Sequence, residues 1–365
     1  MKFTEIINTL EKFAPNSLQE EYDNSGLIIG NKYEDCTGVL LSLDVTESIV
    51  LEAKQRNCNL IVAHHPIVFK GVKRLNGRNY VEKTIEAAIK NGIAIYACHT
   101  NIDNVLKGVN GKIANKIGLT SQSVLLPKEN SLVKISIYAP PANVKQIEKV
   151  VFEVGGGSIG NYSECSFISE GMGGFKPGDH SDPFIGQIGI RHESHESKIE
   201  IISPFWLQNQ IISAVKAVHP YEEVAYEING LKNEYKEIGA GLIGELPESI
   251  SEIEFLNHLK LKFNLKVIKH TRLLNKKIKK VAVCGGSGSF LINQAKSLGA
   301  DIFVTSDIKY HDFFDADDQL ILADIGHYES EQFTIDLFDD ILKEKFPNFA
   351  IQKTNINTNP IEFYL

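Results

Sequence analysis

The segment from Gly38 to Leu119 alternates between short apolar stretches and longer amphipathic ones, and this alternation restricts the possible folds most strongly. The apolar stretches are GVLLSLDV, NLIVAHHP and IAIYACHT. The intervening segments, 46–57 and 80–91, carry apolar residues at helical spacing. Buried strands that alternate with helices of about a dozen residues indicate crossover connections and a mostly parallel sheet with both faces covered.

The same rhythm returns near the C-terminus, where KKVAVCGG, DIFVTSD, QLILADIG and AIQKT are predicted strands and 327–345 is a predicted long helix. Between the two regions the pattern changes to that of an α+β unit with antiparallel strands. We therefore predict an α/β fold in which two related lobes with mostly parallel sheets form one discontinuous domain, 1–125 and 237–365. An α+β domain, 126–236, is inserted between them, because insertions are tolerated where chain ends lie close together at the surface.

Composition narrows the class of protein. The net charge of -8 argues against a protein that coats nucleic acid or an anionic membrane surface. The five cysteines are scattered and never form a C-x-x-C pair, which suits a reducing compartment. No apolar run approaches the roughly 20 residues of a membrane span. We expect a soluble cytoplasmic protein without a membrane or nucleic-acid partner.

Two predicted strand ends carry residues that can bind metal ions. His64 and His65 end the second strand, and Pro66 forces an irregular exit that lets adjacent histidines reach one centre. His99 and Asp103 follow the third strand in a predicted loop, and a carboxylate beside a histidine suits a divalent metal. Taken singly, each motif has a structural explanation as well: histidines that cap or pack, and an aspartate that caps a turn.

A third strand end opens a helix with GHYESEQ, in which His327 and Glu331 are four residues apart and share one helix face. An acidic first helical turn stabilised by the helix dipole is the alternative, and it explains Glu329 better than Glu331. Taken together, the three strand ends offer the nitrogen and oxygen donors that zinc, iron or manganese prefer. The donors are His64, His65, Asp103, His327 and Glu331. They exceed the needs of one closed zinc site and predict two divalent ions that are bridged by a carboxylate and keep open positions for water.

Other motifs are given a structural interpretation. The run GGSGS at 285–289 has amides that suit a phosphate, but it lacks the lysine of a Walker A loop and is taken as a tight turn. GMGGFKPGDHSD is a predicted glycine-rich loop, RHESHES at 191–197 a solvated hairpin, and HPYEE at 219–223 a turn before a strand. Asp23 and Asp44 are either ligand-orienting groups or turn residues, with equal weight.

These motifs, in this order, resemble the GTP cyclohydrolase I type 2 homologues, also called interacting-factor-three-like proteins. The resemblance covers about residues 1–120 and 237–365, and its motifs are YDNSGLIIG at 22–30, AHHP at 63–66, HTNID at 99–103, TSDIKYHD at 305–312 and GHYESEQ at 326–332. It implies that the metal ligands are the five donors named above. It also implies a hexameric ring with the metal sites facing an internal cavity. The central segment resembles the PII/CutA-like domain that some bacterial members carry as an insertion.

Conversion of GTP is attributed to some members of that family, which makes a small nucleotide-like substrate the first expectation. Water would then attack C8 of the guanine ring, and His99 or His311 would transfer the proton, because imidazole titrates near neutral pH. The leading hypothesis is thus a metal-dependent hydrolase that uses a metal-bridging water, with two zinc ions expected first and iron or manganese as alternatives. The second is a metal-stabilised regulatory or scaffold protein whose inserted domain senses a ligand or partner, and the third is a metal-delivery or storage protein.

Overall fold

The structure, a computed structural model, describes residues 1–364. The chain divides into two compact units: a core unit, Met1–Pro127 with Lys236–Leu365, and an inserted unit, Lys128–Tyr235. Each unit has a hydrophobic core of its own. Within residues 1–364, no helix combines the length and the apolar character needed to cross a bilayer.

The first sheet of the core unit has the strand order β1-β4-β3-β2-β15. Four of its strands run parallel, and β1 joins β4 in antiparallel orientation. The strands are β1 (Gly26–Ile29), β2 (Val39–Ser42), β3 (Leu60–Ala63), β4 (Ala94–Ala97) and β15 (Ile351–Lys353). This arrangement confirms the doubly covered, mainly parallel sheet predicted from the alternation of apolar segments.

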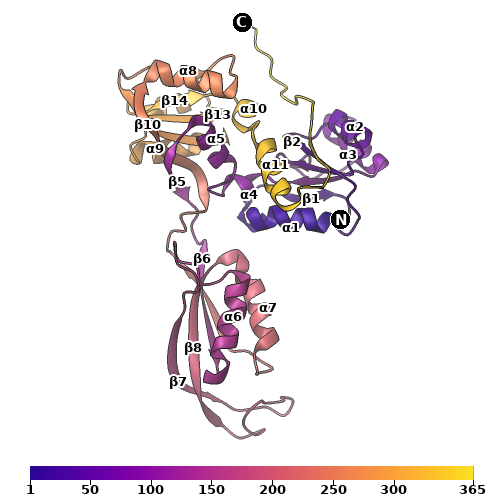
Figure 1. The fold of residues 1–365 in the computed structure, drawn as a ribbon, viewed down its shortest axis with the longest axis vertical. Coiled ribbons are helices and arrows are strands. Elements are labelled where there is room, and N and C mark those ends of the chain that lie inside the picture. The colour runs from indigo at the N-terminus through magenta and orange to yellow at the C-terminus, as the bar shows by residue number, and fades with distance from the viewer. Residues whose placement is uncertain (365) are drawn as a thin grey trace. The chain divides into compact units, whose positions relative to one another are not determined.

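Every residue of β2, β3 and β4 is buried, because helices cover both faces of this sheet. Leu40, Ile61 and Ile95 pack on one face against α2 and α3, whereas the neighbouring strand residues pack on the other against α1 and α11. Figure 1 shows that α1 and α11, from opposite ends of the chain, lie side by side. The helices are α1 (Phe3–Phe13), α2 (Glu47–Gln55), α3 (Tyr80–Asn91), α4 (Thr100–Asp103), α5 (Val109–Ile117) and α11 (Thr334–Lys345).

The second sheet of the core unit is mixed and has the order β11-β14-β13-β12-β10-β5. Its three central strands β14, β13 and β12 are parallel, and antiparallel strands flank them on both sides. Its strands are β5 (Thr120–Pro127), β10 (Gly239–Ser251), β11 (Lys269–His270), β12 (Lys277–Ser287), β13 (Ile302–Ser306) and β14 (Ile321–Asp324). The helices α8 (Glu252–Phe263), α9 (Ile292–Ser297) and α10 (His327–Glu331) belong to the same lobe.

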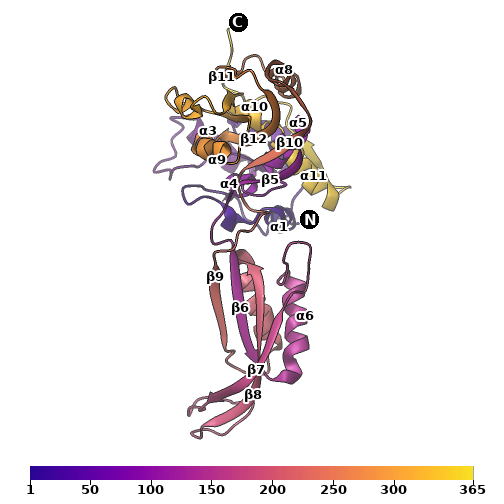
Figure 2. The same ribbon diagram turned by 90° about the vertical axis from the view of Figure 1, so that its left-hand side faces the viewer.

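The inserted unit has a βαββαβ order and an antiparallel sheet, β7-β8-β6-β9, which is the ferredoxin-like topology. Its elements are β6 (Leu132–Ala139), α6 (Val144–Val154), β7 (Phe167–Phe175), β8 (His192–Pro204), α7 (Gln208–Val218) and β9 (Tyr226–Leu231). Both helices contribute to one core with the alternate residues Ile135, Ile137, Ile199 and Ile201 of the sheet. Figure 2 shows α6 along one face of the sheet, which leaves the other face without a helix.

Five local predictions differ from the structure. The first three residues of GGSGS, 285–287, continue strand β12 instead of forming a tight turn. The segment after His99 forms the short helix α4 instead of a loop. The predicted helix 327–345 is divided into α10 and α11, because the Gln332 side chain donates to two backbone carbonyls at the junction. The glycines of GMGGF lie in β7, and RHESHES lies in β8 rather than in a hairpin, because the two segments pair with each other from Phe167 to Phe175.

Candidate metal centre

The candidate metal centre lies where strands of the two core-unit sheets end. His64 and His65 come directly after β3, and Asp103 closes the helix α4 that follows β4. His327 opens α10 three residues after β14, and Glu331 ends the same helix. The carboxyl ends of parallel strands meet at one sheet edge, where ligand sites usually form. The two lobes therefore present their donors to a common space.

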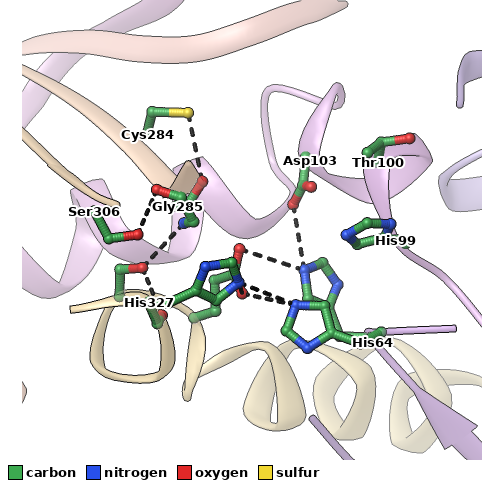
Figure 3. A network of polar contacts seen from close by, with 12 residues as sticks. His64, His99, Thr100, Asp103, Cys284, Gly285, Ser306 and His327 are labelled. Carbon is green, nitrogen blue, oxygen red and sulfur yellow. Dashed lines mark hydrogen bonds and ion pairs between the residues drawn. The ribbon is translucent and has the colours of Figure 1, made fainter. Parts of the chain in front are cut away.

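The five predicted donors come together in this space. His64 Nε2 lies 3.7 Å from both Asp103 Oδ1 and Glu331 Oε1. His65 Nε2 lies 3.1 Å from Glu331 Oε2 and 3.3 Å from His327 Nε2, and His327 Nε2 is also 3.1 Å from Glu331 Oε2. Figure 3 shows the Asp103 carboxylate facing the ring of His64, with His327 on the opposite side of the cluster. The role of these residues as ligands stays a prediction.

Partners on the far side of each ring fix the orientation of the strand-end histidines. His64 Nδ1 lies 2.9 Å from the carbonyl oxygen of Cys98, and His65 Nδ1 lies 2.8 Å from Asp44 Oδ1. Both partners accept hydrogen bonds, so each Nδ1 carries the proton and each Nε2 points its lone pair into the cluster when the ring is neutral. Such partners hold a metal-binding tautomer in place.

Burial and neighbouring charges shift the pKa values of the cluster residues in different directions. Burial lowers the pKa of His64 to about 4. Burial alone would also lower the pKa values of His65 and His327, but hydrogen bonds to carboxylates, and the Glu331 charge, raise them to about 10 and about 9. Burial would raise the pKa of Glu331, yet the surrounding histidines hold it well below its usual range. Burial, reinforced by the Glu331 charge, raises the pKa of Asp103 well above its usual value.

The donor set fits a divalent cation. His64 Nε2 and Asp103 Oδ1 are buried and lack a hydrogen-bond partner within the described residues, whereas Glu331 Oε2 faces two histidine nitrogens at 3.1 Å. Buried polar atoms are seldom left in this state, because desolvation without a partner is costly. A cation among these atoms would satisfy them and would also separate the two ring nitrogens that face each other. Potential ligand atoms within 4.8 Å of one another form two groups that share His65: His64, His65 and His99, and His65, His327 and Glu331.

Sequence similarity over nearly the whole chain identifies its family. The sequence profile of Duf34/NIF3 (NGG1p interacting factor 3) matches residues 1–360. The chain belongs to this family. A relative from Halalkalibacterium halodurans named "GTP cyclohydrolase 1 type 2 homolog" is 37% identical over 363 residues, or 98% of each chain. A relative of the same name from Bacillus subtilis is 36% identical over 366 residues, again 98% of each chain.

Solved structures agree with this assignment. A Bacillus cereus protein related to NIF3 has a TM-score of 0.86 and 37% identity, and the match covers 100% of this chain and 99% of that chain. A Staphylococcus aureus protein has a TM-score of 0.77 and 30% identity over 100% and 99% of the two chains. The resemblance expected from the sequence motifs is thus confirmed, and residues of the candidate centre belong to a Duf34/NIF3 fold.

Two histidines were predicted to transfer protons in this Duf34/NIF3 protein, and the structure places them differently. His99 Nδ1 lies 2.7 Å from Asp23 Oδ1, and the His99 ring lies 5.2 Å from that of His64. His311 is exposed, and its ring contacts within the described residues are with Tyr310 and Phe314. His99 therefore belongs to the cluster, whereas no described contact joins His311 to it.

The sequence analysis assigned no role to Asp307, and it did not show that Gly286 packs against Glu331. Asp307 Oδ2 lies 2.7 Å from His327 Nδ1, so it orients this ring as Asp44 orients His65. The sequence contained a signal for this role. Asp307 comes directly after β13, and Asp44 comes two residues after β2, so both aspartates lie at the carboxyl end of a strand. Gly286 has φ +62°, and a Cβ there would lie 2.3 Å from Glu331 Oε1. This glycine of β12 therefore makes room for the carboxylate.

Proposed function

We propose that this Duf34/NIF3 protein is a metal-dependent hydrolase that acts on a small nucleotide-like molecule. The observation that supports this proposal most is the convergence of buried donor atoms on His64, Asp103 and Glu331, of which His64 Nε2 and Asp103 Oδ1 have no hydrogen-bond partner among the described residues. A site that only stabilises the fold would need fewer donors and would close around its ion. A larger donor set with ring nitrogens held in one orientation suits a pair of ions with positions left for water and substrate.

The proposed ligands of the two ions are the five converging donors: His64, His65, Asp103, His327 and Glu331. His99 lies beside them. Zinc is the first choice for this mixture of imidazole and carboxylate donors, and iron or manganese would accept the same set. Bound ions of this kind would activate water near neutral pH and polarise an oxygen or ring nitrogen of the substrate.

Other residues of the chain would orient the histidine rings and transfer protons. Asp44 and Asp307 hold the rings of His65 and His327, and Asp23 holds that of His99. With its Nδ1 proton donated to Asp23, His99 has Nε2 available to accept a proton from water that attacks a substrate. For a guanine nucleotide, attack of one water at C8 would open the imidazole ring to a formamide, and a second water would hydrolyse this formamide to the amine and formate. His311 remains the second proposed proton carrier.

Turnover by the metal-loaded protein tests the proposal. Full-length protein loaded with zinc, manganese or iron is incubated with GTP and a panel of nucleotides, and products are followed by chromatography. We expect turnover that Asp103→Ala abolishes and that Asp315→Ala, a change at an exposed carboxylate outside the cluster, leaves intact. Absence of turnover of every nucleotide with all three metals would contradict the hydrolase proposal.

A metal-stabilised regulatory or scaffold protein is the second candidate. It is favoured by the inserted unit, whose core of Val133, Ile147, Ile211 and neighbouring residues is separate from that of the core unit. Deletion of residues 128–235 distinguishes the two functions. Unchanged catalysis with loss of a regulatory response supports the hydrolase, whereas retained metal binding without any catalysis supports the regulatory or scaffold role. Readily exchangeable ions without chemistry would instead favour metal storage.

We further propose a cytoplasmic homohexamer. The resemblance to the family suggested this assembly, and all five cysteines are free, as in a reducing compartment. Light scattering coupled to size exclusion tests the assembly directly, and a mass near that of one chain would contradict it. Fractionation of cells that express the tagged protein tests the location.

A further inference from the structure

A cavity of about 660 Å³ opens within the inserted unit. None of the residues that line it has been given a function above. It is bordered by β7, by β8 and by the segment that contains HPYEE. These are the glycine-rich, histidine-rich and HPYEE motifs that the metal centre does not use. The cavity volume is in the range of ordinary small-molecule sites. Three unexplained sequence motifs therefore meet at one hollow.

Glycines of the edge strand β7 form one wall of the hollow. In the β7–β8 register, Gly171 pairs with Glu196 and Gly173 pairs with Ser194, so these residues share one face of the sheet. This is the face without helices, because the alternate residues Ile199 and Ile201 of β8 pack into the helix-covered core. A Cβ at Gly173 would lie 2.8 Å from Glu196 Cγ. The glycine thus lets the glutamate side chain lie across the strand.

Glu196 is a buried carboxylate on the wall of the cavity, with only 8% of its surface exposed. It accepts hydrogen bonds from the Tyr221 hydroxyl at 2.6 Å and the Ser194 hydroxyl at 3.2 Å. Burial, together with this carboxylate, raises the pKa of Tyr221 to about 12, so the phenol keeps its proton and remains a donor. No ion pair to Glu196 is found within residues 1–364. A buried carboxylate without a cationic partner is energetically unfavourable.

The basic side chains Lys198 and His219, close to Glu196 in the fold, have other partners. Lys198, on the same strand, lies 3.1 Å from a carboxylate oxygen of Glu200. The His219 ring uses both nitrogens on the backbone, with Nε2 3.0 Å from the Tyr138 carbonyl and Nδ1 accepting from the Tyr221 amide. That pairing requires a neutral ring. The remaining charged residues on the cavity wall are acidic, namely Glu170, Glu222 and Glu223.

Aromatic rings complete the cavity wall. The Tyr221 ring is 6.5 Å from that of Phe175 and 6.0 Å from that of Phe184, and it is tilted relative to each of them. All three residues line the cavity. Ring faces attract cations through their quadrupole, and aromatic walls beside a carboxylate are the usual recognition site for quaternary ammonium groups.

We propose that the inserted unit binds a small organic cation, an alkylammonium or quaternary ammonium compound, in the cavity between Glu196 and the rings of Phe175, Phe184 and Tyr221. The ligand supplies the positive charge that Glu196 lacks, and the rings surround the apolar groups on the cationic nitrogen. The proposal concerns the inserted unit alone and does not depend on metal binding or on hydrolase activity.

Binding of simple ammonium ions to the full-length protein tests this proposal. Tetramethylammonium, choline and benzyltrimethylammonium are titrated by calorimetry, with 3,3-dimethylbutan-1-ol as the neutral counterpart of choline. We expect choline to bind at least about tenfold more tightly than the alcohol. Glu196→Gln, which keeps shape and hydrogen bonds, should weaken choline binding about tenfold or more. Glu193→Gln, an exposed glutamate of the same strand, should have no effect.

Two further variants make the test decisive. Phe184→Ala removes an exposed ring without disturbing a core and should weaken choline binding while leaving thermal unfolding unchanged. Glu331→Gln, in the candidate metal centre, should leave choline binding unchanged, which separates this proposal from the hydrolase proposal. Failure of all three ammonium ions to bind at millimolar concentration would overturn the proposal. So would a change in oligomeric mass in Phe184→Ala without ammonium binding, because the cavity would then be a contact between copies.

Discussion

Substitution of Gly286 by alanine tests whether this glycine of β12 positions Glu331. Gly286 has φ +62°, and the added Cβ would lie 2.3 Å from Glu331 Oε1 and 3.4 Å from His327 Cε1. The first distance is more than 1 Å inside ordinary contact, which is about 3.5 Å for carbon atoms. Glu331 is 3% exposed and is surrounded by histidine nitrogens, so the carboxylate must leave its place among them.

Two separate costs are expected. The left-handed backbone costs an alanine roughly 1–2 kcal/mol of folding free energy. Displacement of one carboxylate donor should weaken metal binding by about 10- to 100-fold, which corresponds to roughly 1.4–2.8 kcal/mol. Gly299→Ala is the matched control, because Gly299 has φ +69° and a Cβ there would meet no atom within 4 Å. The control should show the first cost and none of the second.

Two separate measurements distinguish backbone strain from displacement of the Glu331 ligand. Urea unfolding in the presence of a chelator gives the free energy of unfolding of each metal-free variant. Competition with a chromophoric chelator gives the zinc affinity of each folded protein. Zinc affinity of Gly286→Ala equal to that of Gly299→Ala would refute the reasoning, because Glu331 could then shift without consequence for metal binding.

Three further predictions concern the same centre. Asp307→Ala should weaken zinc binding about 10- to 100-fold by releasing the His327 ring, whereas Asp315→Ala should not; equal affinities would show that orientation of this ring is unimportant. With pKa values raised to about 10 and about 9, His65 and His327 are protonated at pH 7 in the metal-free protein, so metal binding should release about two protons. Affinity should then rise as pH increases toward 9, and calorimetry at pH 7 in buffers of different ionisation enthalpy counts the protons; no release would contradict the assigned protonation. Removal of metal by a chelator should lower the melting temperature, since saturation at 100 times Kd contributes about 2.7 kcal/mol; an unchanged melting curve would argue against a native-state metal site.

The sequence alone determined the class of fold and the neighbourhood of the candidate centre. Stretches such as LIVA and AIYA are apolar at every position, so they form strands that are buried on both faces. The histidines that follow them then lie at the carboxyl edge of a parallel sheet. This inference needs only local patterns, because hydrophobic periodicity is a property of neighbouring residues.

Local pattern was a weaker guide where backbone pairing between distant segments decides the outcome. GMGGF has the composition of a loop and RHESHES that of a solvated hairpin, yet the two pair as β7 and β8. Glycine and charged residues have low strand propensity, but tertiary pairing overrides it. The division of the predicted helix after Glu331 likewise depends on a side-chain contact from Gln332 to Phe263, which is distant in the sequence.

Only the tertiary structure decided how the candidate donors face one another. The sequence offered His65 and Glu331 as members of one set, but their 3.1 Å approach depends on how two lobes pack against each other. Packing within each lobe selects the Cys98 carbonyl and Asp307 as partners of the histidine rings and brings Gly286 against Glu331. Sequence spacing sets which residues end a strand, whereas distances between strand ends in different sheets arise from packing of the whole core.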